Sequence, residues 1–263
     1  MADGLQNIDL RGTVSDEEWR ARVELAALYR LVALYGWDDL VFTHISHRVP
    51  GPDHHFLINP YGYLFEEITA SSLVKVDLDG NIISDTDYSI NAAGFTIHSA
   101  VHAAREDAMA VIHVHTDHGV AVSSQKEGLL PLNQTALLVR KDVAYHDYEG
   151  VALDLDERAR LVADLGPEKC SMLLRNHGTL AIGATASTAF TRMYMLERAC
   201  TMQILSLSAG RDGVLECDDS LQGLVAKQGG MTGKTVNTPK FTDNVVWPAL
   251  LRKLERVAPD YKT

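Results

Sequence analysis

Hydrophobic positions recur with a helical period in several segments of the chain. In residues 15–37 a serine precedes three acidic residues, and apolar side chains then recur along one face. The same pattern marks residues 92–105, 155–166 and 187–210, and the last two of these ranges end at a glycine. A capping side chain, acidic residues in the first turn and a terminal glycine are typical of helix ends. The pattern therefore predicts a helix over each range.

Between these segments, short runs of apolar and β-branched residues predict strands. They cover residues 40–49, 55–60, 73–82, 108–116 and 171–183. The DLDGN sequence in the third run predicts a hairpin turn, and a polar turn divides the last run into two apolar halves. Helices and strands alternate throughout, with several hairpin-like connections, which predicts one α/β domain with a largely antiparallel sheet.

The C-terminal part of the chain has a different composition. Residues 226–244 are rich in Gly, Thr and Lys, which favours a linker or a surface arm. Residues 245–259 form an amphipathic segment that we expect to be a terminal helix, packed on the body or on a neighbouring subunit. We therefore predict a main domain over residues 15–210 and a C-terminal arm with its helix over residues 211–263.

Composition narrows the class of protein. The 263 residues are 46% hydrophobic and 22% charged, as in soluble globular proteins. The net charge of −11, without a basic cluster, argues against a nucleic-acid partner. The sequence has no apolar run of membrane-spanning length, and its first residues do not resemble a signal peptide. Three scattered cysteines suit a reducing compartment. We expect a cytoplasmic protein that binds neither nucleic acid nor membrane.

The sequence VIHVHTDHG, residues 111–119, raises the question of a metal site. Side chains alternate along a strand, so His113 and His115 point to the same face and could share one ion. Zinc takes histidine nitrogens at about 2.0–2.1 Å. A third ligand must come from elsewhere, and His177, in a turn after a strand, is a candidate. Hydrogen-bonded strand histidines without a metal remain the alternative at this point, and spacing does not assign His118.

Six further histidines are interpreted as structural. His98 and His102 lie four residues apart on one face of the predicted helix, a spacing that also suits a metal, but packing against a core is commoner for such residues. The rest are scattered, and we assign no chemistry to them: His44, His47, His54 and His55.

Several motifs together resemble the class II aldolase/adducin family, and most closely the adducin head domain and its bacterial relatives. The resemblance covers about residues 20–210, with the motifs in the family's order. They are FLINPYGYLFEEITASSLVKVDLDGNI, NAAGFTIHSAVHAAR, HVHT, VAYHDYEG and LLRNHG. It implies a three-layer α/β/α sandwich around a mostly antiparallel sheet. It also implies a cyclic homotetramer with active sites between subunits, and a zinc ion, or another divalent metal, held by His113, His115 and His177.

The chain departs from the family's aldolases at the substrate site. Those enzymes carry a Ser-Ser-Glu segment that grips phosphate and supplies the catalytic acid/base, whereas residues 92–94 here are Ala-Ala-Gly. Gly94 has no side chain that could donate or accept a proton. The family's Gly-Asn-x-Ser loop reads Thr-His-Ile-Ser at residues 43–46, and its Thr-Pro-Thr-Gly reads Asn-Pro-Tyr-Gly at residues 59–62. These departures argue against a phosphosugar substrate. The candidate substrate-binding positions that remain are Ser46, Asn59 and Gly62.

An intact three-histidine site without the glutamate fits a lyase that cleaves a C–C bond in a small oxygenated substrate. Decarboxylation is compatible because the loss of CO2 creates the carbanion without prior proton abstraction, while aldol cleavage stays open. Tyr145 is our candidate catalytic acid, with His146 and Tyr148 as other proton sources. Asp117 and His118 are weaker candidates to line the pocket.

The alternative hypothesis is that the protein is a scaffold without catalytic activity. The adducin head shares the NxAGFT departure and belongs to a cytoskeletal protein that binds actin and spectrin. The segment after Gly210 has no strongly basic run comparable to adducin's tail. We therefore favour an enzyme with a small-molecule substrate, and expect an actin partner only if the chain is a scaffold.

Overall fold

A seven-stranded mixed sheet organises the described part of the computed structural model, which comprises residues 9–150, 156–229 and 238–263. In spatial order its strands are β3 (Val74–Val76), β2 (Phe56–Ile58), β1 (His44–Arg48), β4 (Ala110–Val114), β7 (Gly178–Gly183), β6 (Ser171–Leu174) and β5 (Val143–His146). Neighbouring strands are antiparallel except β5 and β6, which are parallel. The predicted mostly antiparallel sheet is thus confirmed, with one parallel pair at an edge.

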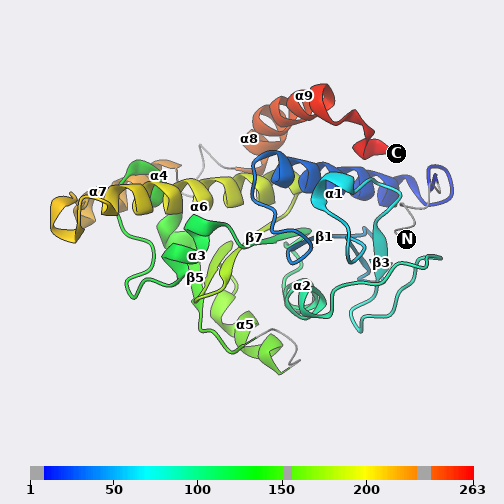
Figure 1. Ribbon diagram of the computed structural model, residues 1–263, viewed down its shortest axis with the longest axis horizontal. Helices are drawn as coiled ribbons and strands as arrows, with labels where there is room; N and C mark the ends of the chain where they lie inside the picture. The colour runs from blue at the N-terminus through cyan, green and yellow to red at the C-terminus, as the bar shows by residue number, and fades with distance from the viewer. Residues whose placement is uncertain (1–8, 151–155, 230–237) are drawn as a thin grey trace.

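Helices cover both faces of this sheet (Figure 1). One face carries α1 (Asp16–Leu34) and α6 (Ala186–Leu207), and the other carries α2 (Ala92–Ala104) and α5 (Glu157–Leu165). Alternate residues of β4 serve the two faces, since Ile112 packs with the α1 and α6 core and Val111 with the α2 and α5 core. The period-two alternation of a strand thus builds the three layers that the family resemblance implied.

Local sequence explains where the helices begin and end. The Ser15 hydroxyl accepts from the Glu18 amide at the start of α1, and Thr185 does the same for Thr188 at the start of α6. Gly166, with φ of 61°, ends α5. The four predicted helices are confirmed within a few residues at each end; residue 155, the first of the third range, lies outside the described residues.

Shorter elements were less well predicted. The DLDGN turn is present, but it closes with a single bridge between Val76 and Ile82 rather than with a second strand. Helices α3 (Asp117–Ser123) and α4 (Gln134–Val139) were not predicted. Helix α7 (Asp219–Gly229) overlaps the start of the expected linker over residues 226–244, of which residues 230–237 lie outside the described part.

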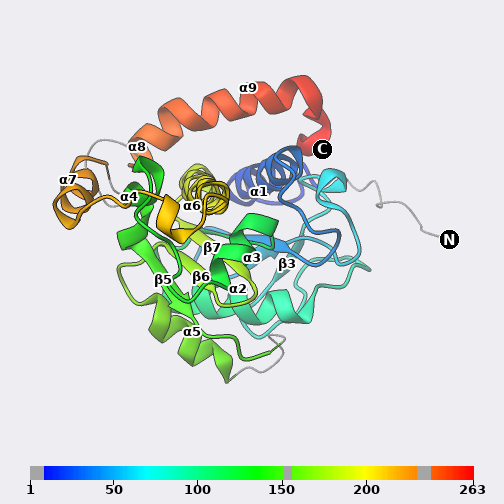
Figure 2. The ribbon, with the colours of Figure 1, turned by 60° about the vertical axis from the view of Figure 1, so that its left-hand side comes forward.

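The C-terminal segment folds back on the main body. Helix α8 (Pro239–Phe241) leads through the π-helical turn η4 (Thr242–Val246) into α9 (Trp247–Val257), as expected for a terminal helix. In Figure 2, α9 lies outside α1 and α6 as a further layer. Trp247, Leu254 and Tyr261 join the same apolar core as α1, so the terminal helix packs on its own chain. No helix in the described ranges combines the length and apolarity needed to cross a bilayer.

Candidate metal centre

Three imidazoles meet at one end of the central strands. His113 lies in β4, His115 directly follows it, and His177 stands in the turn between β6 and β7. One nitrogen from each ring lies within 4.8 Å of those of the other two. The Nε2 atoms of His113 and His115 are 3.0 Å apart, and the His177 ring centroid is 4.8 and 4.9 Å from theirs. The same-face pair predicted from spacing is therefore present, together with the distant third histidine.

Backbone geometry brings His177 to the pair. Asn176 has a φ of 57°, in the left-handed region that asparagine tolerates, and so reverses the chain between β6 and β7. Gly178 follows because no side chain fits there: a Cβ atom would lie 2.6 Å from the Val114 carbonyl oxygen and 3.0 Å from the His115 ring. The Asn-His-Gly sequence thus sets one imidazole against the end of β4.

Each ring of the strand pair is oriented through its second nitrogen. His113 Nδ1 donates to the Thr179 carbonyl at 3.0 Å, and His115 Nδ1 lies 3.0 Å from an Asp39 carboxylate oxygen. Such partners fix the tautomer, leave Nε2 free for a metal and increase its basicity. Asp39 was not predicted, since nothing in its sequence context separates it from Asp38.

A buried carboxyl group supports this arrangement from the α6 face. Glu197 is 2% exposed and accepts from the hydroxyls of Thr179, at 2.6 Å, and of Thr116. Burial raises the pKa of this carboxyl group. The two threonines flank the site. The Thr179 carbonyl oxygen also accepts the hydrogen bond from His113 Nδ1, and Thr116, directly after His115, caps the start of α3. Glu197 therefore holds together the strand ends that carry the candidate ligands His115 and His177.

Burial and neighbouring histidines favour the neutral forms of His113 and His177. Burial, and then the neighbouring histidines, lower the pKa of His113 well below its usual range. The same causes lower the pKa of His177 to about 4. Metal ions bind the neutral imidazole, so at pH 7 neither ring must lose a proton first. The all-histidine donor set and the orientation of its strand pair fit a divalent cation, and zinc in particular.

A fourth imidazole, which we had interpreted as structural, borders this site. His44 pairs with His113 in the register of β1 and β4, and their ring centroids are 5.2 Å apart. Its ring fills the space at Gly94, where a Cβ atom would lie 2.4 Å from His44 Cδ2. The two departures noted at residues 43–46 and at residue 94 are therefore sterically linked.

The side chains of the predicted substrate-binding residues Ser46 and Asn59 form hydrogen bonds with other residues of the protein. The Ser46 hydroxyl lies between His98 and His102, and the Asn59 amide oxygen accepts from the Tyr29 hydroxyl at 2.9 Å. Gly62 lies in the loop after β2 with a φ of 91°. Their roles toward a substrate remain predictions.

Of the predicted proton sources, Tyr148 makes a ring contact with one of the three histidines. Its ring centroid is 6.3 Å from that of His177, and its side chain is exposed. The Tyr145 hydroxyl instead accepts from the Leu129 amide at 3.1 Å, with the Arg175 guanidinium over its ring. His146 is buried between Glu157 and Asp164.

The two residues that follow His115 by a short distance lie in α3. Asp117 is in its first turn, and His118 contacts the Thr201 hydroxyl of α6 at 3.3 Å. The contact of His118 with Thr201 agrees with leaving His118 out of the candidate ligand set.

The hollow beside His177 is acidic. Its charged lining includes Asp147, Glu149 and Glu157, with Arg175 as the basic member. Arg160 pairs with Glu149 outside the hollow, so the excess of negative charge in the lining rests on Asp147 and Glu157 against Arg175.

Residues 23–204 match the family described as Class II Aldolase and Adducin N-terminal domain. The chain belongs to this family. It is 61% identical to a putative aldolase class 2 protein of Caulobacter vibrioides over 262 residues, or 99% of each chain. It is also 45% identical to mouse alpha-adducin over 218 residues, which is 80% of this chain but 30% of that protein. The family predicted from the motifs is thus confirmed.

Solved structures of the family share the fold. A crystal structure of an aldolase II superfamily protein from Pseudomonas syringae has a TM-score of 0.89 at 51% identity, covering 97% of this chain and 99% of that one. An L-fuculose 1-phosphate aldolase from Glaciozyma antarctica has a TM-score of 0.80 at 28% identity, covering 94% and 93%. Lyases of the aldolase type are therefore among the relatives of this chain.

Proposed function

We propose that this protein is a metal-dependent lyase that cleaves a C–C bond in a small, unphosphorylated, oxygenated substrate. His113, His115 and His177 hold the metal, with zinc as the expected ion. The observation that supports this proposal most strongly is the convergence of three imidazoles, two of which, His113 and His115, are oriented by hydrogen bonds from their Nδ1 atoms. Bound there, a divalent ion supplies Lewis-acid stabilisation of negative charge that develops on a substrate oxygen.

The protein's own groups favour decarboxylation, which needs no glutamate base, and leave aldol cleavage open. Gly94 offers no carboxylate, and the acidic hollow beside His177 disfavours phosphate. When a carboxylate leaves as CO2, the electron pair of the broken bond stays on the adjacent carbon, which then needs a proton. Tyr148, exposed beside His177, is placed to deliver it, ahead of Tyr145.

Metal analysis tests the ligand set. The purified wild-type protein should retain about one divalent ion per chain, and His113→Ala and His177→Ala should each lose it. His118→Ala, a histidine of the same motif outside the set, serves as the control and should keep the ion. Equal metal content in all four proteins would refute the assignment. Assays of small keto and hydroxy acids for CO2 release or aldehyde formation then separate the two reaction types.

We also propose a homo-oligomer, with a tetramer as the expected state. Leu40 and Phe42 are 62% and 53% exposed and follow Asp39, the partner of His115. Exposed apolar side chains so close in sequence to the partner of His115 suit burial by a second subunit. Light scattering measures the subunit number, and a monomer at micromolar concentration would contradict this expectation.

The similarity to alpha-adducin supports a second candidate, a non-catalytic scaffold. It predicts co-sedimentation with actin filaments and no turnover of any acid in the screen. Retained zinc with turnover would favour the lyase.

A further inference from the structure

Four buried side chains form a hydrogen-bonded chain that starts beside the candidate metal centre. His44 and Ser46 come from β1, and His98 and His102 come from α2; none is more than 3% exposed. His44 Nδ1 lies 3.0 Å from His98 Nε2, His98 Nδ1 contacts the Ser46 hydroxyl, and that hydroxyl lies 2.7 Å from His102 Nε2. The proposed lyase function does not itself require this chain.

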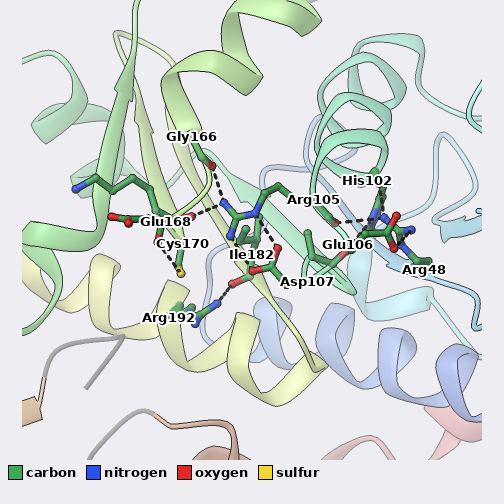
Figure 3. A network of polar contacts seen from close by, with 12 residues as sticks. Arg48, His102, Arg105, Glu106, Asp107, Gly166, Glu168, Cys170, Ile182 and Arg192 are labelled. Atoms are coloured by element: carbon green, nitrogen blue, oxygen red, sulfur yellow. Dashed lines mark hydrogen bonds and ion pairs between the residues drawn. The ribbon is translucent and has the colours of Figure 1, made fainter. Parts of the chain in front are cut away.

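The far end of the chain has a fixed polarity. His102 Nδ1 lies 3.0 Å from the Ala108 carbonyl oxygen. A carbonyl can only accept, so this nitrogen carries the proton and His102 Nε2 is an acceptor. Arg48 holds the same end in place by donating to the His102 carbonyl (Figure 3).

This polarity propagates to the metal centre. The Ser46 hydroxyl donates its one proton to His102, so its oxygen accepts from His98 Nδ1–H. His98 Nε2 then carries no proton and accepts a hydrogen bond from His44 Nδ1–H. His44 Nε2 therefore carries a lone pair. Burial lowers the pKa of His98 well below the usual range, which agrees with a neutral ring in the middle of this chain.

The His44 ring is held between a candidate ligand, His113, and the start of α2. It lies beside His113 and against the first turn of α2, where a Cβ atom on Gly94 would be 2.7 Å from His44 Nε2. The absence of a side chain at Gly94 leaves room for this imidazole.

We infer that His44 is a specificity-determining residue whose Nε2 accepts a hydrogen bond from a hydroxyl group of the substrate. The substrate class is then a small hydroxy acid or hydroxy ketone, with a hydroxyl beside the oxygen that the ion takes. His98, Ser46 and His102 are positioning residues, because they keep the proton on His44 Nδ1. This inference rests on the proposed metal site, so zinc content is measured in every sample used below.

Tautomers give a test that requires no turnover. In ¹⁵N-histidine NMR spectra of the protein, assigned with single variants, His44, His98 and His102 should all carry the proton on Nδ1. Ser46→Ala interrupts the chain and should increase the Nε2–H form of His44. A His44 with its proton on Nε2 in the wild type, or a tautomer ratio unchanged by Ser46→Ala, would overturn the inference.

Ligand discrimination gives the second test. Calorimetry on zinc-loaded protein compares glycolate with methoxyacetate, which keeps the oxygen but lacks the hydroxyl proton. Wild type should bind glycolate about tenfold more tightly, the size expected of one hydrogen bond in a buried site. His44→Leu removes the acceptor, and Gly94→Ala displaces the ring; both should keep zinc and bind the two acids equally.

Gly223→Ala is the matched control, because a Cβ atom there meets nothing within 4 Å, and it should behave as wild type. Preference for glycolate retained in folded His44→Leu or in Gly94→Ala contradicts the inference, as does a zinc-loaded wild type without preference. A wild type that takes up no zinc overturns the proposed metal site and this inference together, whereas zinc uptake without discrimination overturns the inference alone.

Discussion

At the scale of single residues, the candidate site depends on the partners of the ligands as much as on the ligands themselves. Histidine spacing and the family resemblance identified His113, His115 and His177, because those signals lie in the sequence itself. Asp39 and Glu197 reach the site from distant parts of the chain, and no local pattern marks them. His44 could have been suspected only from its register opposite His113, which the sequence does not encode in a readable way.

Asp39 offers a direct test of this support. Asp39→Asn should weaken zinc affinity by about 10- to 100-fold while the fold is kept, because the amide no longer increases the basicity of His115. Competition with a chromogenic chelator measures the affinity. Asp38→Asn removes the same charge one position earlier, and among the described contacts Asp38 makes none with His115. Equal affinities in the two variants would show that the Asp39 contact does not tune the metal.

At the scale of elements, long periodic segments were predictable and short ones were not. The helices α1 and α6 have 19 and 22 residues, so several turns repeat the apolar face. Helices α3 and α4 have seven and six residues, too few to show a period against their neighbours. The order of the strands in the sheet could not be predicted from the sequence either, because β1 pairs with β4 although α2 lies between them in the chain.

The docking of α9 can be measured at this scale. Leu254 is fully buried against the main core, so Leu254→Ala should lower the free energy of unfolding by about 3 kcal/mol. Val257→Ala, at a position 58% exposed on the same helix, should cost less than about 0.5 kcal/mol. Urea unfolding followed by circular dichroism gives both values. Similar losses in the two variants would mean that α9 is not held through its buried face.

At the scale of the whole molecule, buried neutral histidines make stability depend on pH. The pKa of His102 falls to about 3 on burial, and that of His98 falls well below the usual range. Below pH 6.5 the unfolded chain therefore binds protons that the native protein excludes. Stability from these groups is present above that pH and is lost as the pH falls.

We expect the free energy of unfolding to fall by about 2 kcal/mol per such histidine between pH 6.5 and pH 5. Denaturant titrations across this range measure the slope. His102→Gln should reduce the slope, whereas His54→Gln, at a half-exposed histidine, should leave it unchanged. A slope that does not respond to His102→Gln would contradict the assignment.

The position of β4 and β7 at the middle of the sheet has a consequence for metal exchange. Both strands that bear or adjoin the ligands have a hydrogen-bonded neighbour on each side, while β3 and β5 form the edges. Partial opening in proteins starts at edges and termini, and central strands open with the whole domain. Amide protons of β4 should therefore exchange with solvent last, and the ligand set should stay assembled while the edges fray. A metal held by these histidines would then exchange without local unfolding of β4.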